Sequence, residues 1–385
     1  MLKYKKFFPM LLMVLLAGCG DEGVEESSSA SLESSEVTVS ISEEESSSST
    51  EVVSREEEML AEMTLEEKVG QMFLARYPDV DSVYYARDYE LGGYIWFAKD
   101  FEMKDPALVN EEIASIQAEM PIDLFMAVDE EGGDVVRISS FPQYRSVPFS
   151  TPRAAFDEGG WDGVEAFALE QIALLKELGF NLNLAPVVDV ASGPDDFIYH
   201  RAFSTDVAEV SQFAEVFVSA YKDANMGTVL KHFPGYGSNV DTHTGVAYDD
   251  RSLEALKERD LVPFQVGIAN GSEAVLVAHN VMEAIDPDWP ATLSPRVIAI
   301  LREDMGFEGI IMTDDLVMDG LQAFATPEEA AVLAVLAGND VLISSDFMVQ
   351  IPAVLDAVED GRISEKLIDA AVLRILKVKS EMGIL

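Results

Sequence analysis

Short apolar runs alternate with longer amphipathic stretches along the chain, from about residue 60 to the C-terminus. The runs have the length and composition of buried strands, and the stretches between them repeat apolar residues at helical spacing. A Thr64-Leu-Glu-Glu67 capping box opens one such helix, in which Val69, Met72 and Phe73 recur at helical spacing. We expect strands at residues 93–98, 124–129, 182–189, 227–232, 274–279, 309–314 and 340–345, and helices at 161–178, 208–224, 253–269 and 327–336.

This order predicts an α/β fold with a parallel sheet. Continuous apolar strands separated by helices are typical of parallel strands that are covered on both faces. Seven or eight such units in about 330 residues favour a single (β/α)8 barrel domain. A doubly wound open sheet is the alternative, but no glycine-rich dinucleotide fingerprint follows the first expected strand.

The N-terminus has the pattern of a lipoprotein signal. Lys3, Lys5 and Lys6 precede an apolar run over residues 7–16, and Leu-Ala-Gly-Cys follows at residues 16–19. This resembles the lipobox of bacterial lipoproteins, which implies that Cys19 becomes an acylated N-terminus and holds the mature protein outside the cytoplasmic membrane. A plain N-terminal anchor helix is the alternative. Cys19 is the only cysteine, so an internal disulfide framework and a cysteine-based metal cluster are excluded.

Acidic residues dominate the rest of the chain. The formal net charge of −44 excludes nucleic-acid binding as a primary role, because phosphate backbones would be repelled. Residues 20–58 carry serine runs and 13 acidic residues against one arginine, so we expect a disordered, extended tether. Residues 59–385 form the expected barrel domain and keep a net charge of −35, which we interpret as a solvated acidic surface.

Polar side chains stand where nearly every expected strand ends. Because the C-terminal ends of barrel strands converge on one face, these residues predict an active site there. They are Asp129, Asp189, Lys231, His232, His279 and Asp314, and the chain's four histidines (His200, His232, His243 and His279) all lie at or just beyond such ends.

Two glycine-containing segments follow these strand ends and are suited to close approach of a ligand. One is Glu131-Gly-Gly133, after Asp129, and the other is residues 234–237, after His232. The second segment leads to Asp241-Thr-His243. A carboxylate two residues from an imidazole can hold one ring nitrogen and raise the basicity of the other, which would make His243 an acid and base near neutral pH.

Four ordered blocks resemble family 3 glycoside hydrolases, in the β-N-acetylglucosaminidase branch. The blocks are Lys-His-Phe-Pro-Gly-Tyr-Gly at 231–237 with Asp-Thr-His at 241–243, Ala-Val-Asp-Glu-Glu-Gly-Gly at 127–133, Ala-Pro-Val-Val-Asp-Val at 185–190, and Met-Thr-Asp-Asp-Leu-Val-Met at 312–318. The similarity covers roughly residues 60–385. It implies a (β/α)8 barrel that retains anomeric configuration through a glycosyl-enzyme ester.

The resemblance also implies roles for single residues. Asp314 would be the nucleophile, and His243 assisted by Asp241 would be the general acid and base. The sugar hydroxyls would be held by Asp129, Arg201, Lys231 and His232. Larger family members often take the acid from a second domain; because this chain ends at Leu385, we expect the acid in the barrel.

The chain departs from the family pattern at several places. The family often has a second histidine where Tyr236 stands, and a basic residue where Asp134 stands. The stretch between Gly237 and Asp241 is one residue shorter than in better known members. Residues 198–203, which contain Arg201, match the family's arginine motif only loosely.

Several alternatives stay open at this point. A metal-dependent barrel hydrolase would use His232, His243, His279, Asp129 and Asp314 as ligands. A substrate-assisted mechanism would use Asp129 and Glu130 as orienting carboxylate and acid, with the substrate acetamide as nucleophile. A β-glucosidase, an N-acetylglucosaminide phosphorylase and a sugar-binding lipoprotein without turnover are further alternatives.

The function that we predict is that of a lipid-anchored, extracytoplasmic exo-β-N-acetylglucosaminidase. It would remove terminal GlcNAc from cell-wall fragments, in peptidoglycan turnover, or from chitin-like oligosaccharides. No cofactor or metal is expected. We expect a monomer whose partners are the carbohydrate substrate and, through Cys19, the membrane.

Overall fold

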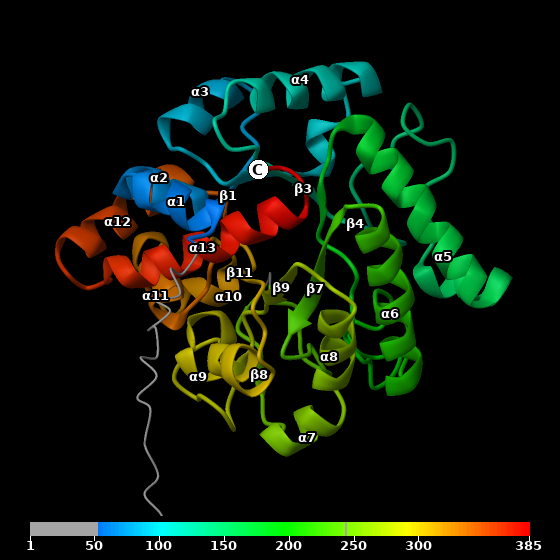
Figure 1. Ribbon diagram of the computed structural model, residues 1–385. Coiled ribbons are helices and arrows are strands. Elements are labelled where there is room, and N and C mark those ends of the chain that lie inside the picture. Colours follow the sequence, from blue (N-terminus) through cyan, green and yellow to red (C-terminus); the bar gives the residue numbers. More distant parts are fainter. Residues whose placement is uncertain (1–52, 243–244) are drawn as a thin grey trace, which may run out of the picture. The chain divides into compact units, whose positions relative to one another are not determined.

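Eight parallel strands form a barrel at the centre of the protein. The computed structural model describes residues 53–242 and 245–385 (Figure 1). In this part of the chain, the barrel strands are β1 (Phe73–Arg76), β2 (Gly93–Trp96), β3 (Phe125–Val128), β6 (Leu182–Asn183), β7 (Gly227–Phe233), β9 (Ala274–Val277), β11 (Ile310–Thr313) and β12 (Leu342–Ser344). Neighbours in the sheet follow the order β11-β9-β7-β6-β3-β2-β1-β12.

Hydrogen bonds between its two ends bring the sheet to closure. A parallel bridge joins Met312 to Val341, and the Thr313 amide donates to the Val341 carbonyl over 3.0 Å. The strands are buried almost throughout, as expected for parallel strands covered by helices. The predicted (β/α)8 barrel is therefore confirmed.

Helices surround the barrel and connect its strands. They are α1 (Arg55–Glu62), α2 (Leu65–Gln71), α3 (Ser82–Asp88), α4 (Pro106–Ala118), α5 (Pro152–Leu178), α6 (Val207–Asp223), α7 (Leu253–Glu258), α8 (Leu261–Ala269), α9 (Pro295–Ala299), α10 (Asp319–Gln322), α11 (Pro327–Ala337), α12 (Phe347–Glu359) and α13 (Glu365–Glu381). Shorter elements lie in the loops: β4 (Glu130–Gly132), β5 (Val135–Val136), β8 (Tyr248–Asp249), β10 (Val281–Met282), η1 (Ala98–Asp100), η2 (Ala291–Leu293) and η3 (Ile300–Asp304).

Each predicted strand overlaps a barrel strand, but the prediction missed β1. The Thr64–Glu67 capping box opens α2 as expected, and the helix ends at Gln71. Phe73 then belongs to β1, which pairs with β2 and β12. The helical spacing extends into this strand because only Met72 separates the two elements, and the last turn of α2 is buried like β1.

Two predicted helices have different limits in the structure. The stretch 253–269 is divided into α7 and α8, because Arg259 leaves helical geometry and Asp260 turns inward to an ion pair with Arg251 at 2.8 Å. Helix α5 begins earlier than the predicted residue 161, and it kinks at Gly160, where φ is 64°. The predicted segment thus corresponds to the part of α5 beyond the kink.

The folded unit begins earlier than the expected residue 59. Ser54 caps α1 by accepting a hydrogen bond from the Glu57 amide, so residues 55–58 are helical rather than part of a tether. Helix α1 packs against α13, and its Met59 and Leu60 side chains contact the main core. Burial of Met59 and Leu60 stabilises this helix, although the polar composition of residues 20–58 predicts a disordered segment.

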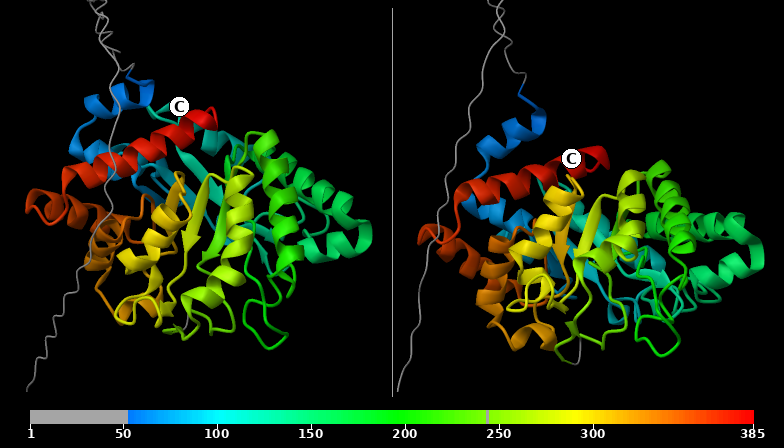
Figure 2. Two further views of the ribbon diagram at one scale, coloured as in Figure 1. Left: turned by 60° about the horizontal axis from the view of Figure 1, so that its bottom comes forward. Right: turned by 90° about the horizontal axis from the view of Figure 1, so that it is seen from below.

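The two ends of the folded unit lie at the barrel end where the strands begin. The ammonium of Lys379, on α13, donates over 3.0 Å to the carbonyl of Gly92, directly before β2. Figure 2 shows α1 and the C-terminus on one side of the barrel, while the arrowheads of its strands point to the opposite side. In the described residues, no helix has the length and apolar character needed to cross a bilayer.

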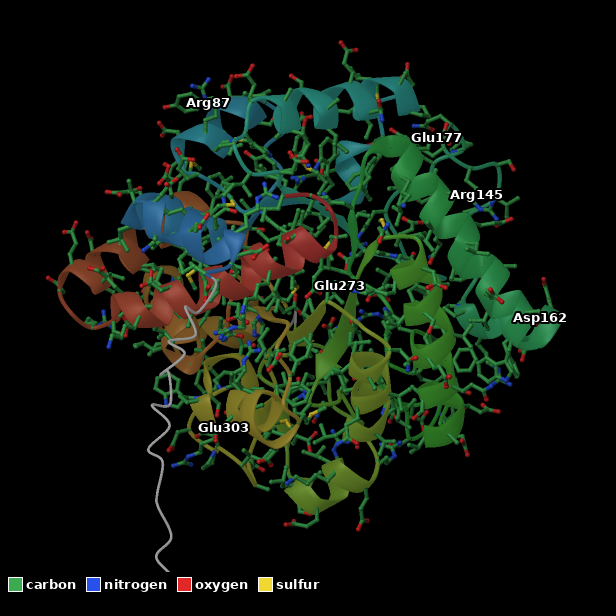
Figure 3. All side chains as sticks on the ribbon, in the orientation of Figure 1. Arg87, Arg145, Asp162, Glu177, Glu273 and Glu303 are labelled. Carbon is green, nitrogen blue, oxygen red and sulfur yellow. The ribbon has the colours of Figure 1, made fainter. Side chains whose placement is uncertain are left out.

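Charged side chains lie mostly on the outside of the helices. Asp162 and Glu177 on α5, and Glu303 on η3, are exposed and project outward (Figure 3). A small buried cluster of Val187, Ala191, Ile198 and Tyr236 lies apart from the main core and supports the loops that follow β6 and β7.

Candidate active site

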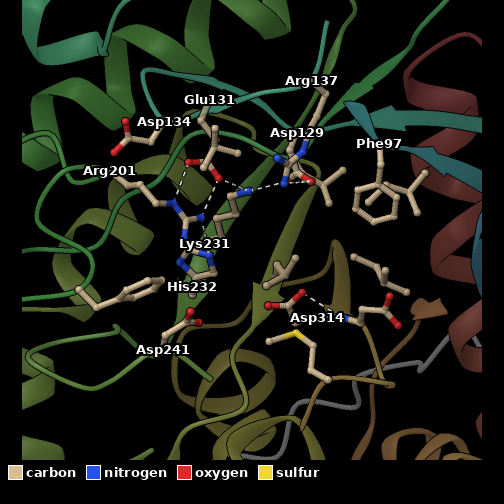
Figure 4. Close-up of a pocket in the computed structure, with 18 of the residues that line it drawn as sticks. Phe97, Asp129, Glu131, Asp134, Arg137, Arg201, Lys231, His232, Asp241 and Asp314 are labelled. Carbon is tan, nitrogen blue, oxygen red and sulfur yellow. Dashed lines mark hydrogen bonds and ion pairs between the residues drawn. The ribbon is translucent and has the colours of Figure 1, made fainter. Parts of the chain in front are cut away.

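A cavity of about 490 Å³ opens at the C-terminal ends of the barrel strands. This volume is within the range of small-molecule sites. Its lining includes six of the predicted site residues, Asp129, Arg201, Lys231, His232, Asp241 and Asp314, although they come from five different segments of the chain (Figure 4). Two further predicted residues, Cys19 and His243, lie outside the described residues.

Lys231 and Arg201 are fixed by one carboxylate, that of Glu131. The Lys231 ammonium lies 2.6 Å from Glu131 Oε1, and Arg201 donates to both Glu131 oxygens over 2.8 and 3.0 Å. Burial alone would raise the pKa of Glu131, but Arg201 and Lys231 outweigh it and hold that pKa well below its usual range. Glu131 is therefore ionised, and both cations have fixed positions at the cavity wall.

Asp129 adds a second acceptor to this cluster. It accepts a hydrogen bond from the Lys231 ammonium over 2.7 Å and lies 3.8 Å from Arg137. Asp129 follows β3, whereas Lys231 is on β7. The donors and acceptors at this wall are of the kind that bind sugar hydroxyls.

His232 is held in one tautomer by its neighbours. Arg201 Nη2 donates to His232 Nε2 over 3.0 Å, because a guanidinium has no acceptor. The hydrogen of the neutral ring is therefore on Nδ1, which donates to Asp189 Oδ2 over 2.7 Å. The other oxygen of Asp189 accepts from the Tyr236 amide over 2.6 Å. Asp189 thus orients the imidazole and fixes the start of the next loop.

Asp314 follows β11 directly and faces the cavity. Its amide donates to the Val277 carbonyl over 3.2 Å, and its Oδ1 accepts from the Asp315 amide over 2.8 Å. In Figure 4, Asp241 lies below the His232 ring, and Asp314 lies farther from the Glu131–Arg201 pair. A carboxylate in this position can attack the carbon of a sugar whose hydroxyls are held at the opposite wall.

Asp315 has a different environment from Asp314, although it lines the same cavity. It accepts hydrogen bonds from the Ser345 hydroxyl and from the amides of Ser345 and Val317, at 3.1 and 3.2 Å for the amides. Burial raises the pKa of Asp315. Its contacts show that it ties the loop after β11 to the end of β12.

The remaining described histidines differ in position. His200 lines the cavity at an exposed place. His279 is fully buried outside the lining, with Nδ1 at 2.8 Å from the Thr292 hydroxyl and Nε2 at 3.1 Å from the Asp315 carbonyl. It supports the loop that contains Asp314 and Asp315.

Glu130 is also a structural residue. It is fully buried, does not line the cavity, and accepts from the amides of Arg137, Ile138 and Ser139 over 2.9, 2.8 and 3.2 Å. Burial raises its pKa. The substrate-assisted alternative requires Glu130 to reach the substrate as the acid, and Glu130 does not line the cavity.

The sequence places Asp189 at a strand end of the expected site but assigns it no role, and it does not single out Glu131. Glu131 stands two residues beyond Asp129, in a segment noted only for its glycines. Side chains two residues apart in an extended segment share a face, which is the signal that could have identified Glu131. Within residues 53–242 and 245–385, no three His, Cys, Asp or Glu side chains are grouped as a metal site.

Residues 64–378 match the glycosyl hydrolase family 3 N terminal domain. The chain belongs to glycoside hydrolase family 3. This confirms the predicted family and enzyme class. The match covers the barrel and every described residue of the cavity.

Several family 3 relatives resemble this chain over much of its length. A beta-hexosaminidase of Xylella fastidiosa is 36% identical over 237 residues, which make up 60% of this chain and 69% of the relative. A family 3 beta-N-acetylglucosaminidase from Paenibacillus sp. str. FPU-7 superimposes with a TM-score of 0.77 at 31% identity, covering 84% of this chain and 63% of that one. A family 3 glycosyl hydrolase from Mycobacterium smegmatis gives a TM-score of 0.75 at 30% identity, covering 83% and 98%. This chain thus spans less than two thirds of the Paenibacillus enzyme.

The structure shows where the residues that depart from the family 3 pattern lie. Arg201 lines the cavity and contacts Glu131 and His232, although its sequence block is only a loose match. Asp134 lines the cavity at an exposed place. Tyr236 is buried within the loop that leads to Asp241.

Proposed function

We propose that this family 3 protein is a retaining exo-β-N-acetylglucosaminidase that removes terminal β-linked GlcNAc from cell-wall-derived or chitin-like glycans. One observation carries the proposal: Asp314, at the end of β11, and Asp241 line the same cavity as the fixed cluster of Lys231, Arg201 and His232. A nucleophile, the partner of a proton donor and a hydroxyl-binding wall thus surround one sugar-sized space.

The proposed reaction has two steps. Asp314 attacks the anomeric carbon while His243 donates its proton to the leaving oxygen, which breaks the glycosidic bond and forms a glycosyl ester. In the second step His243 takes a proton from water, whose oxygen attacks the anomeric carbon and releases Asp314. Asp241 stabilises the protonated imidazole in both steps. The wall of Lys231 and Arg201 holds the hydroxyls throughout.

The choice of substrate rests on the relatives. The Xylella protein is named a beta-hexosaminidase and the Paenibacillus protein a beta-N-acetylglucosaminidase. We extend this specificity to the present chain. The acetamido sugar is then the preferred substrate, and the corresponding glucoside is a poor one.

The location of the protein is part of the same proposal. Lys3, Lys5 and Lys6, the apolar run after them and the Leu-Ala-Gly-Cys sequence ending at Cys19 support lipid anchoring outside the cytoplasmic membrane. In cells that process lipoproteins, Cys19→Ser is expected to abolish incorporation of labelled fatty acid. Unchanged incorporation would refute acylation at Cys19.

Hydrolysis of aryl β-N-acetylglucosaminide and aryl β-glucoside by the full chain tests the activity. Asp314→Asn is expected to lower turnover of the acetamido sugar by at least about 10³-fold, because the nucleophile is lost. The matched control is Asp319→Asn, an exposed carboxylate on α10 outside the cavity, which should leave turnover unchanged. Turnover of neither sugar by folded wild-type protein would refute the proposal and favour the sugar-binding alternative.

Two further measurements separate the remaining alternatives. A slow fluorinated glycoside should leave a sugar ester on the peptide that contains Asp314, as detected by mass spectrometry; an unlabelled Asp314 under turnover would contradict the covalent step. Adding inorganic phosphate should not change the rate or the product. Formation of a sugar phosphate would identify a phosphorylase instead.

A further inference from the structure

Tyr236 belongs to the segment that follows β7, and its hydroxyl contacts Thr242, later in the same segment, twice. The Thr242 amide donates to the Tyr236 oxygen over 2.9 Å, and the two hydroxyl groups are 3.0 Å apart. Both residues are almost completely buried, with exposed fractions of 3% and 2%. The phenol therefore satisfies one backbone donor and one side-chain group that water does not reach.

Tyr236 is itself tied to the sugar-binding wall. Its amide donates to Asp189, the carboxylate that also holds the His232 ring. The Tyr236 ring packs edge-on against the His232 ring, with centroids 5.4 Å apart, and against Phe197 at 5.5 Å. Tyr236 thus has a fixed position relative to His232.

Thr242 is held on a second side by α10. The Gly320 amide donates to the Thr242 carbonyl over 3.2 Å. A methyl group at position 320 would come within 2.8 Å of this carbonyl oxygen, so only glycine permits the contact. This helix follows the loop that contains Asp314, so Thr242 contacts both Tyr236 and the segment that follows Asp314.

We propose that Tyr236 is a positioning residue for Asp241, the carboxylate assigned to the general acid, and that it acts through Thr242. Thr242 stands between Asp241 and His243 in the sequence, and its amide, hydroxyl and carbonyl are all fixed. Tyr236 therefore sets where the Asp241 carboxylate lies relative to Asp314. This inference rests on the proposed function, since it assigns Tyr236 a part in the same acid catalysis.

The leaving group of the substrate distinguishes this role from a merely structural one. A poor leaving group such as phenyl needs protonation, whereas dinitrophenyl leaves without it. Tyr236→Phe removes the hydroxyl and both contacts with Thr242. We expect kcat/KM for phenyl β-N-acetylglucosaminide to fall about 10- to 100-fold, and that for the dinitrophenyl glycoside by less than about 3-fold.

The pH profile gives a second readout. Asp241 raises the pKa of a neighbouring imidazolium, so its displacement should move the alkaline limb of kcat/KM to lower pH in Tyr236→Phe. Thr242→Ser keeps the hydroxyl and should retain wild-type behaviour. Thr242→Val loses one of the two contacts with Tyr236, so it should change both readouts in the same direction as Tyr236→Phe but by less. Tyr84→Phe, at an exposed position on α3 outside the active-site cavity, is the matched control and should change neither readout.

The outcomes separate this inference from the proposed function. Melting curves first establish that each variant is folded. The positioning role is refuted if wild-type protein is active but Tyr236→Phe lowers kcat/KM equally for both glycosides and leaves the alkaline limb in place. It is also refuted if Tyr236→Phe changes neither readout. In both cases the proposed function stands. If folded wild-type protein hydrolyses no glycoside, the proposed function fails and this inference fails with it.

Discussion

Replacing Glu131 by glutamine should destabilise the protein more than any exposed charge replacement. The Glu131 carboxylate is 4% exposed and contacts Lys231 and Arg201 at 2.6–3.0 Å. Glutamine keeps the shape and one acceptor oxygen, but it leaves two buried cations with less compensating charge. Breaking such a buried pair costs about 3–5 kcal/mol. Urea unfolding at neutral pH measures this difference directly.

The matched control is Glu170→Gln, which removes the 2.9 Å ion pair with Arg145 on the surface of α5. Its carboxylate is 60% exposed, so the expected loss is at most about 1 kcal/mol. The stabilisation by Glu131 also depends on pH. Because the pKa of folded Glu131 lies below its unfolded value near 4, its stabilisation is present above about pH 4 and is lost as pH falls further. A loss for Glu131→Gln no larger than for Glu170→Gln would refute the reasoning.

Three other variants test separate features. Burial lowers the pKa of Lys379 to about 7. Between about pH 7 and 10 the unfolded chain therefore binds more protons than the folded chain, so the free energy of unfolding should rise with pH across that range. Urea titrations at several pH values should show this rise for wild-type protein and not for Lys379→Met. Gly320→Ala should lower kcat/KM about 10-fold or more and also lower the melting temperature, since the methyl group meets the Thr242 carbonyl and displaces Thr242. Asp189→Asn keeps one acceptor oxygen, so its NH2 faces either the His232 ring or the Tyr236 amide, and kcat/KM should fall about 10- to 100-fold; wild-type kinetics would contradict the assigned contacts.

The barrel was predictable because its signal is local. The strand before Asp314, for example, is a continuous apolar run that ends in a charged residue, and both features follow from burial between helices. The sequence does not reveal strand β1, because Phe73 continues the helical spacing of Val69 and Met72 in the preceding helix. Strand β6 is shorter than expected because Pro186 lacks an amide hydrogen for the ladder.

The site was predictable only in part, for a related reason. Asp129, Lys231 and Asp314 stand at strand ends, so topology alone brings them together. Glu131 and Asp189 act by contacts with residues 70 and 43 positions away in the chain. No local pattern specifies such a pairing, and the closure of the barrel is what creates it.

The packing of α1 against α13 has a practical consequence. The chain enters the folded unit at the barrel end where the strands begin, while the cavity opens at the other end. An affinity tag, a fluorophore or a resin linkage joined directly to residue 53 is therefore attached at the barrel end where the strands begin, and the cavity opens at the other end. Protein immobilised through this end keeps its cavity accessible to long, insoluble glycans. A fluorophore at this end does not compete with the glycan for the cavity.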